Sequence, residues 1–277
     1  MKNILKFGIN GNVLKIIAII AMVIDHIGFY FSPFLGNELM LVCRYIGRIA
    51  MPIFTYLIVQ GFFHTKDFKK YLLRLLLCAS ITQIALWLII GINIKYVPQY
   101  TAANYEHKTL NTLFTYAISL VLMKIMHEKL LVKKWDYNKN MSFKAILIIL
   151  LVLVSVILPI DYGESVVVLT ILLYLIERLK ITFMINTETI REFVGKIIKI
   201  DQLKVIHIIY VALIFISILL VTLFLNVNIF ALFAILPIAL YNGERGNKSE
   251  ILKKCFYYVF AFQHVALYSV AMLLMLT

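Results

Sequence analysis

Long apolar stretches, most of them close to 20 residues, alternate with short polar connections along the whole chain. An α-helix needs about 20 apolar residues to cross a bilayer, and only helices and closed barrels satisfy their backbone there. Barrel strands would read as shorter segments of alternating hydrophobicity. The pattern predicts an all-α polytopic membrane protein, a single integral domain over residues 1–277, with about nine transmembrane helices. We place these helices at residues 13–32, 41–63, 70–91, 110–127, 143–160, 165–180, 205–225, 228–241 and 255–275.

Composition strengthens this prediction. Hydrophobic residues make up 62% of the chain, and the mean hydropathy is +0.93. Soluble domains are close to half apolar, and a compact fold of this size would still expose much of its surface. Lipid must therefore be the solvent for most of these side chains.

The net charge of +13 is distributed unevenly. Basic residues gather in every second connection, which by the positive-inside rule predicts a cytoplasmic N-terminus and location in the cytoplasmic membrane. This explains the charge without nucleic acid, for which the chain carries no stacking motif. Lys2 and Lys6 precede the first apolar run as in a signal peptide, but Asp25 and His26 interrupt that run. We interpret it as a retained first helix. The connections expected inside are 64–70, 128–142, 181–204 and 242–254; those expected outside are 33–40, 92–109 and 161–164.

Residues 186–204 have a different pattern. Thr189 and Glu192 have the spacing of a capping box, and the apolar residues that follow share one helical face. This predicts an amphipathic helix on the cytoplasmic surface, with a plain linker helix as the alternative.

Known soluble-enzyme and metal motifs are absent from the sequence. Cys43, Cys78 and Cys255 are isolated, so neither a zinc site nor a disulfide framework is indicated. No Walker, nucleophile-elbow, zincin or dinucleotide motif occurs. Asp25, His26 and His264 are metal-ligating residue types, but their spacing does not indicate a site. We therefore expect no metal.

Ionisable residues inside apolar spans are costly in lipid, which makes them candidates for function. In the first span, Lys15 and His26 are eleven residues apart, so they lie on one helical face about 16 Å from each other. Histidine can take and return a proton near neutral pH, and Asp25 adjoins it. The alternatives are a lysine that snorkels to the interface and a structural Asp–His pair.

The second span contains Arg44 and Arg48, one turn apart on one face. Arg48 is expected at the same depth as the first-span histidine, in the outer half of the membrane. Arg44 alternatively extends outward, and Arg48 alternatively pairs with Asp25 for structure alone. Gly47 and Pro52 permit close packing or a kink beside them.

Four further residues complete the candidate site. Asn111 begins the fourth span, Asp161 lies in the outer turn between spans five and six, and His264 is inside span nine. Arg245 lies near the cytoplasmic boundary, where it and Lys15 are expected to bind anionic donor groups. The nearby aromatic residues, Phe29, Tyr30, Tyr257 and Tyr258, we interpret as packing or interface residues.

Several segments together resemble the TraX family, the pilin-acetylation proteins of conjugation systems. The resemblance is strongest over residues 14–75 and 236–268. It rests on LKIIAIIAMVIDHIGFYF, CRYIGRIAMPIFTYLIVQGFFHTKDFKKYLLRLL, LNTLFTYAISL, DYG, LYNGERGNK and FYYVFAFQHVALY.

TraX proteins are in turn similar to membrane acyltransferase family 3, whose first helix carries a basic residue and then a histidine eleven positions later. Lys15 and His26 have that spacing, although lysine replaces the commoner arginine. The resemblance implies that His26 is the essential base and that cytoplasmic acetyl-CoA is the donor. We assign catalysis to His26, Asp25 and Arg48, and substrate binding to Lys15, Arg44, Asn111, Asp161, Arg245 and His264.

The expected activity is therefore acetyl transfer to an acceptor at the membrane or its outer face. The acceptor would be the N-terminal amine of an exported or membrane protein such as a pilin, or a cell-envelope amine or hydroxyl. Two alternatives remain: a small-molecule or proton-coupled transporter that uses the same residues as a relay, and a non-catalytic factor in pilus or export assembly.

Overall fold

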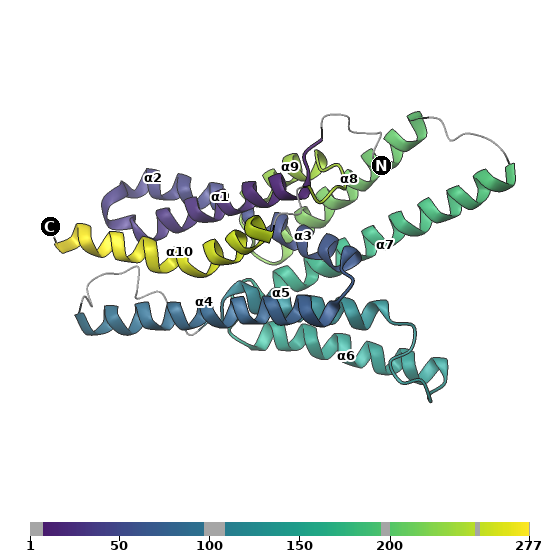
Figure 1. Ribbon diagram of the computed structural model, residues 1–277, viewed down its shortest axis with the longest axis horizontal. Helices are drawn as coiled ribbons and strands as arrows, with labels where there is room; N and C mark the ends of the chain where they lie inside the picture. Colours follow the sequence, from purple (N-terminus) through teal and green to yellow (C-terminus); the bar gives the residue numbers. More distant parts are fainter. Residues whose placement is uncertain (1–7, 97–108, 195–199, 247–249, 277) are drawn as a thin grey trace.

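A computed structural model describes residues 8–96, 109–194, 200–246 and 250–276, and their regular secondary structure is helical throughout (Figure 1). Two isolated bridges, Ile9 with Tyr241 and Leu110 with Ile160, are the only β-type pairings in these ranges. The helices are α1 (Gly11–Tyr30), α2 (Ser32–Gly47), α3 (Ala50–His64), α4 (Phe68–Tyr96), α5 (Thr112–His127), α6 (Tyr137–Ile157), α7 (Gly163–Val194), α8 (Ile200–Phe224), the 3-10 helix η2 (Ile229–Ala234), α9 (Ile235–Ala239) and α10 (Glu250–Leu276).

Within the described residues, five helical segments are long and apolar enough to cross a bilayer, which confirms the all-α class and indicates a membrane protein. They are Gly11–Tyr30, Ser32–His64, Phe68–Ile92, Tyr137–Ile157 and Val205–Phe224. Shorter apolar helices occupy Thr112–His127, Ile229–Ala239 and Phe262–Met275. The count of nine crossings and the side of the N-terminus stay predictions.

The second predicted span, residues 41–63, is not one continuous helix. α2 ends at Gly47 and α3 begins at Ala50, so the chain turns at Arg48 and Ile49. Pro52 explains the position of this turn: it has no N–H to donate to the carbonyl of Arg48, and its ring crowds that carbonyl. The break sets Arg48 at a helix junction.

Residues 33–40, predicted as an outer loop, belong instead to α2. α1 and α2 form a hairpin whose bend is at Gly36. This residue has a φ of +64°, so it interrupts α2 between two helical pieces. The two helices touch at two glycines. A Cβ on Gly28 would lie 2.6 Å from Cys43 Cβ, and a Cβ on Gly47 would overlap the side chain of Asp25. Small residues thus permit the contact that brings Asp25 against α2.

The predicted span 228–241 is also divided, into η2 and the short α9.

Farther upstream, α7 continues through residue 194 and α8 begins at residue 200. Residues 195–199 of the predicted surface helix 186–204 lie outside the described residues, and that helix stays a prediction.

α1 and α10 run side by side, with their N-terminal ends near each other (Figure 1). The segment before α10 holds the start of α1: Gly11 N–H donates to the Glu244 carbonyl at 2.7 Å, and Asn12 N–H to the Arg245 carbonyl at 3.2 Å. α10 also packs along α4. The main buried core joins α1, α3, α4, α5, α7, α8 and the η2–α9 segment.

Candidate functional site

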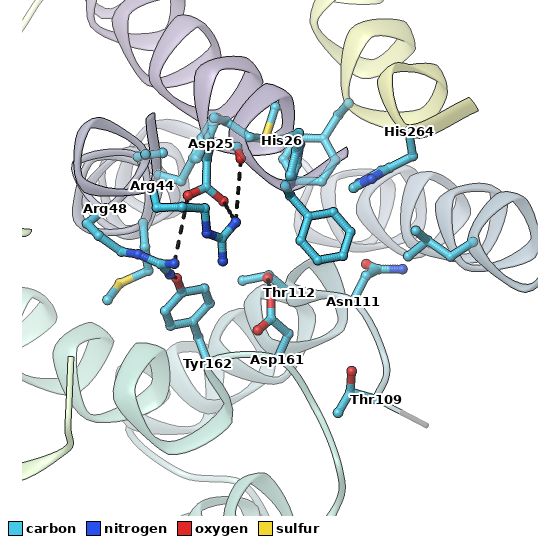
Figure 2. A pocket seen from close by; sticks show the side chains of 18 of the residues that line it. Asp25, His26, Arg44, Arg48, Thr109, Asn111, Thr112, Asp161, Tyr162 and His264 are labelled. Carbon is cyan, nitrogen blue, oxygen red and sulfur yellow. Dashed lines mark hydrogen bonds and ion pairs between the residues drawn. The ribbon is translucent and has the colours of Figure 1, made fainter. Parts of the chain in front are cut away.

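A cavity of about 180 Å³ lies where α1, the α2–α3 junction, α4, α10, the start of α5 and the α6–α7 turn meet (Figure 2). Its lining comes from segments far apart in the sequence. Seven of the nine predicted site residues border it: Asp25, His26, Arg44, Arg48, Asn111, Asp161 and His264.

Asp25 joins α1 to both arginines. Arg44 Nη1 donates to Asp25 Oδ2 at 2.6 Å, whereas Arg48 Nη2 lies 3.8 Å from Asp25 Oδ1. Arg44 therefore does not extend outward, and it rather than Arg48 is the main partner of this carboxylate. A direct, charge-assisted bond of this kind is roughly twice as strong as a neutral one.

Arg48 makes its hydrogen bond to another residue, donating from Nη1 to the hydroxyl of Tyr162. Tyr162 has a φ of +54°, a left-handed conformation that is costly for a bulky residue. Gly163 permits the turn, because a Cβ there would overlap the carbonyl oxygen of Ser155 on α6. Burial raises the pKa of Tyr162 to about 12, so the hydroxyl stays protonated at neutral pH. Sequence reasoning noted this turn but missed Tyr162.

His26 faces α10 across the cavity (Figure 2). Its ring centroid is 4.3 Å from that of His264, with the rings tilted by 48°. His264 Nδ1 is hydrogen-bonded to the hydroxyl of Tyr30 at 3.1 Å. Tyr30, interpreted from the sequence as a packing residue, is buried and fixes this imidazole. Two histidines from opposite ends of the chain thus adjoin in one cavity.

Asp161 supplies a carboxylate on the opposite wall. Thr112 Oγ1 donates to its Oδ2 at 2.6 Å, and Thr115 Oγ1 donates to its backbone carbonyl at 2.9 Å. The side chain is accessible from the cavity. Burial by the surrounding protein raises the pKa of the carboxyl, and the hydrogen bond from Thr112 partly opposes that rise. Within the described part of the chain, no lysine, arginine or histidine lies at ion-pair distance from it.

Asn111 holds the wall together. Its Oδ1 caps α5 by accepting from Leu113 N–H at 3.1 Å, and its Nδ2 donates to the Ala79 carbonyl at 2.8 Å and to Gln83 Oε1 at 3.0 Å. These bonds tie the start of α5 to α4. The predicted role of Asn111 in substrate binding stays a prediction beside this structural one.

Lys15 and Arg245 do not border the cavity. Lys15 Nζ lies over the ring of Phe256, 4.8 Å from its centroid, near the N-terminal end of α1. The backbone of Arg245 accepts a hydrogen bond from Asn12 at the same end. The two residues therefore share one end of the α1–α10 pair, and Lys15 is about 16 Å from His26 by the helical rise.

A second buried polar cluster was missed from the sequence. Glu177 Oε2 accepts from Gln60 Nε2 at 2.8 Å and from the Tyr210 hydroxyl at 2.6 Å. Lys180 Nζ pairs with Glu177 Oε1 at 2.6 Å, and both side chains are almost fully buried. The cluster joins α3, α7 and α8. The signal in the sequence was Glu177, a glutamate near the end of an apolar span, and the prediction of topology from loop charges did not use it.

The arrangement in the cavity suits acid–base chemistry. An imidazole pair, two guanidinium groups and two carboxylates surround one space that is partly shielded from solvent. A base can take a proton from a nucleophile there, and cationic donors can stabilise a developing oxyanion. Among the described residues, no group of three metal-ligating side chains is arranged to hold an ion.

Comparisons with known proteins give the family. A relative described as "Probable fimbrial assembly protein FimC, serogroup H1", from Dichelobacter nodosus, is 35% identical over 120 residues, which are 42% of this chain and 46% of that protein. "Uncharacterized protein RP591", from Rickettsia prowazekii (strain Madrid E), is 46% identical over 52 residues, 19% of each chain. The matches thus span about half and about a fifth of these relatives. No solved structure matches the chain. The model of the TraX protein family matches residues 10–272, so this chain belongs to the TraX family.

Proposed function

We propose that this protein is a membrane-embedded acetyltransferase that moves an acetyl group from acetyl-CoA to an amine at the membrane or its outer face. One observation carries the proposal: a single cavity contains an imidazole pair, two guanidinium groups and a carboxylate that has no ion-pair partner within the described residues. The resemblance of the sequence to pilin-acetylation proteins names the activity, and the cavity supplies groups suited to it.

In the proposed reaction, His26 removes a proton from the acceptor amine. The nitrogen lone pair attacks the thioester carbonyl, the C–N bond forms, and the C–S bond breaks. The proton passes from His26 to the leaving thiolate of CoA. An acceptor that binds as an ammonium ion first releases its additional proton to solvent through the partly open cavity. Arg48, positioned by Tyr162 and only loosely paired with Asp25, donates to the carbonyl oxygen while it carries negative charge.

Asp161 makes the cavity prefer an acceptor group that carries positive charge. A carboxylate with no ion-pair partner among the described residues is suited to bind an ammonium group, and Thr112 holds one of its oxygens in place. The amine then lies on the wall opposite the two arginines. We therefore favour an amine over a hydroxyl as the acceptor.

The donor nucleotide is proposed to dock at the end of the α1–α10 pair where Lys15 and Arg245 lie. The pantetheine arm would extend along these helices towards His26. The backbone N–H groups at the start of α1 are already bonded to Asn10 and to the 244–245 carbonyls, so phosphate binding would depend on side-chain charge.

A second candidate is a non-catalytic role in fimbrial assembly, favoured by the fimbrial assembly protein among the relatives. This role needs the fold but not a base. It therefore predicts that removal of the imidazole of His26 leaves assembly unchanged.

The experiment that tests the proposal is intact mass spectrometry of envelope proteins from cells with and without this protein. An added acetyl group that depends on the protein identifies the acceptor. His26→Ala should lower the acetylation rate by about a hundredfold or more, because a general base commonly supplies that much. His207→Ala is the control, because His207 lies on α8, where its Nε2 is 3.1 Å from the Ala239 carbonyl. A folded His26→Ala protein with near wild-type acetylation would refute the mechanism, and unchanged assembly without any acetylation would favour the assembly role.

A further inference from the structure

Besides Asp25 Oδ1, which faces Arg48 Nη2 at 3.8 Å, two buried polar atoms beside the cavity lack a hydrogen-bond partner among the described residues. One is Nδ1 of His26, and the other is Oε1 of Gln263 on α10. Buried polar groups are nearly always paired, so each such atom requires an explanation. Gln263 is only 7% exposed, and its Nε2 is 3.4 Å from the Sδ of Met22, one turn before His26 on α1. Its amide therefore lies beside the His26 ring.

The two unpaired atoms are chemically complementary. Nδ1 is a donor when it carries the proton, and an amide oxygen is an acceptor. If Nδ1 carries the proton, Nε2 keeps its lone pair and is the basic nitrogen. A partner at Nδ1 therefore decides which nitrogen can act as the base.

Asp25 cannot be that partner. Its carboxylate is bound to Arg44 at 2.6 Å and faces Arg48 at 3.8 Å. Consecutive residues of a helix also point in different directions, so Asp25 and His26 do not face each other. The orienting group must come from another helix, and α10 presents Gln263 immediately before His264.

We propose that Gln263 is the positioning residue of His26: its Oε1 accepts a hydrogen bond from Nδ1–H and so leaves Nε2 as the base in the cavity. This inference rests on the proposed function for the role of His26, but the contact itself does not depend on it. A neutral amide suits the location, because a buried carboxylate at this position would need a cation of its own within the membrane. The interaction of the Gln263 side chain with the His26 imidazole agrees with such a contact.

The contact is tested without an acceptor substrate, by diethyl pyrocarbonate, which modifies the neutral imidazole. Purified protein in detergent is treated across a pH series, and modification of His26 is followed by peptide mass spectrometry. Gln263→Glu places an anion at Nδ1, so the pH midpoint for His26 should rise by about one unit or more. His207 on α8 is the internal reference, and its midpoint should stay unchanged.

Gln263→Met is the matched variant, because it keeps the volume and the contact with Met22 but removes the acceptor. Its His26 midpoint should not rise. Once an acceptor substrate has been identified, the kcat of Gln263→Met for acetylation should be lower by roughly tenfold or more, because His26 loses its preferred tautomer. The KM for acetyl-CoA should not change. An unchanged midpoint in folded Gln263→Glu, or an unchanged kcat in Gln263→Met, would overturn the assignment. If wild-type protein acetylates nothing while the Gln263→Glu midpoint rises, the proposed function fails and the contact stands.

Discussion

At the scale of single residues, the two arginines of the cavity are not equivalent. They are one turn apart on the same face, yet Arg44 holds Asp25 at 2.6 Å while Arg48 bonds to Tyr162 and lies 3.8 Å from the carboxylate. Arg44 is thus bound to the protein's own anion. Arg48 lies farther from that anion, and its guanidinium carries five N–H groups, so it is the better candidate to donate to a substrate.

This difference predicts different costs of removal. Arg44→Ala should destabilise the protein by roughly 3 kcal/mol, because it leaves a largely buried carboxylate without its close partner. Arg48→Ala should cost less, since Asp25 keeps Arg44, but it should reduce activity more. Thermal unfolding in detergent measures the first quantity, and acetylation rates measure the second. In the Arg44→Ala background, Asp25→Asn should recover much of the stability. Equal losses for the two arginines, or no recovery, would contradict the pairing.

At the scale of helices, two features position the site. Pro52 ends the hydrogen-bonding pattern four residues upstream, which leaves Arg48 at a junction. The α1–α2 contact depends on Gly47, where a Cβ would overlap Asp25. The geometry of the charged cluster is therefore set by backbone features of the helices that carry it.

Gly47→Ala tests this dependence. The added methyl group must push α1 and α2 apart, so we expect destabilisation of about 1 to 3 kcal/mol and loss of activity. Gly91→Ala on α4 is the control, because a Cβ there meets nothing within 4 Å. It should be neutral or stabilise by up to about 1 kcal/mol through helix propensity. Thermal unfolding of both variants in the same detergent makes the comparison. A drop of the same size in Gly91→Ala would show that helix contact is not the cause.

At the scale of the whole molecule, the cavity lies in the half near the α1–α2 bend, and Lys15 and Arg245 lie towards the other end. The buried Glu177–Lys180 pair joins α3, α7 and α8 away from the cavity. One end thus carries the proposed chemistry and the other the proposed donor contacts. This division has functional meaning only if the two ends face opposite sides of the membrane.

Single-cysteine labelling tests that orientation, in a background where the three native cysteines are replaced by serine. Asn37→Cys, at the exposed α1–α2 bend, should react with an impermeant maleimide added to intact cells. Trp135→Cys, exposed between α5 and α6, should react only after the membrane is permeabilised. The expectation follows from the basic residues around position 135. Labelling of position 135 from outside would reverse the assigned orientation.

The class of protein and most of the candidate chemistry follow from the amino-acid sequence alone. Apolar runs near 20 residues require helices in lipid, because the backbone must satisfy itself locally. The cost of charge in lipid then singled out Asp25, His26, Arg48 and His264 without knowledge of the fold.

Which of these groups meet, and in what geometry, depends on how the helices pack. Arg44 and Arg48 share a face, so their partners depended on how closely α1 approaches α2 at Gly47. Glu177 and Gln263 were missed because a polar residue in an apolar span reveals nothing of its partner until another helix packs against it. Helix formation depends on residues that are neighbours in the sequence, whereas a site forms where helices distant in the sequence pack together. In a membrane, this packing depends on close contacts between helices, which hydrophobicity patterns do not encode.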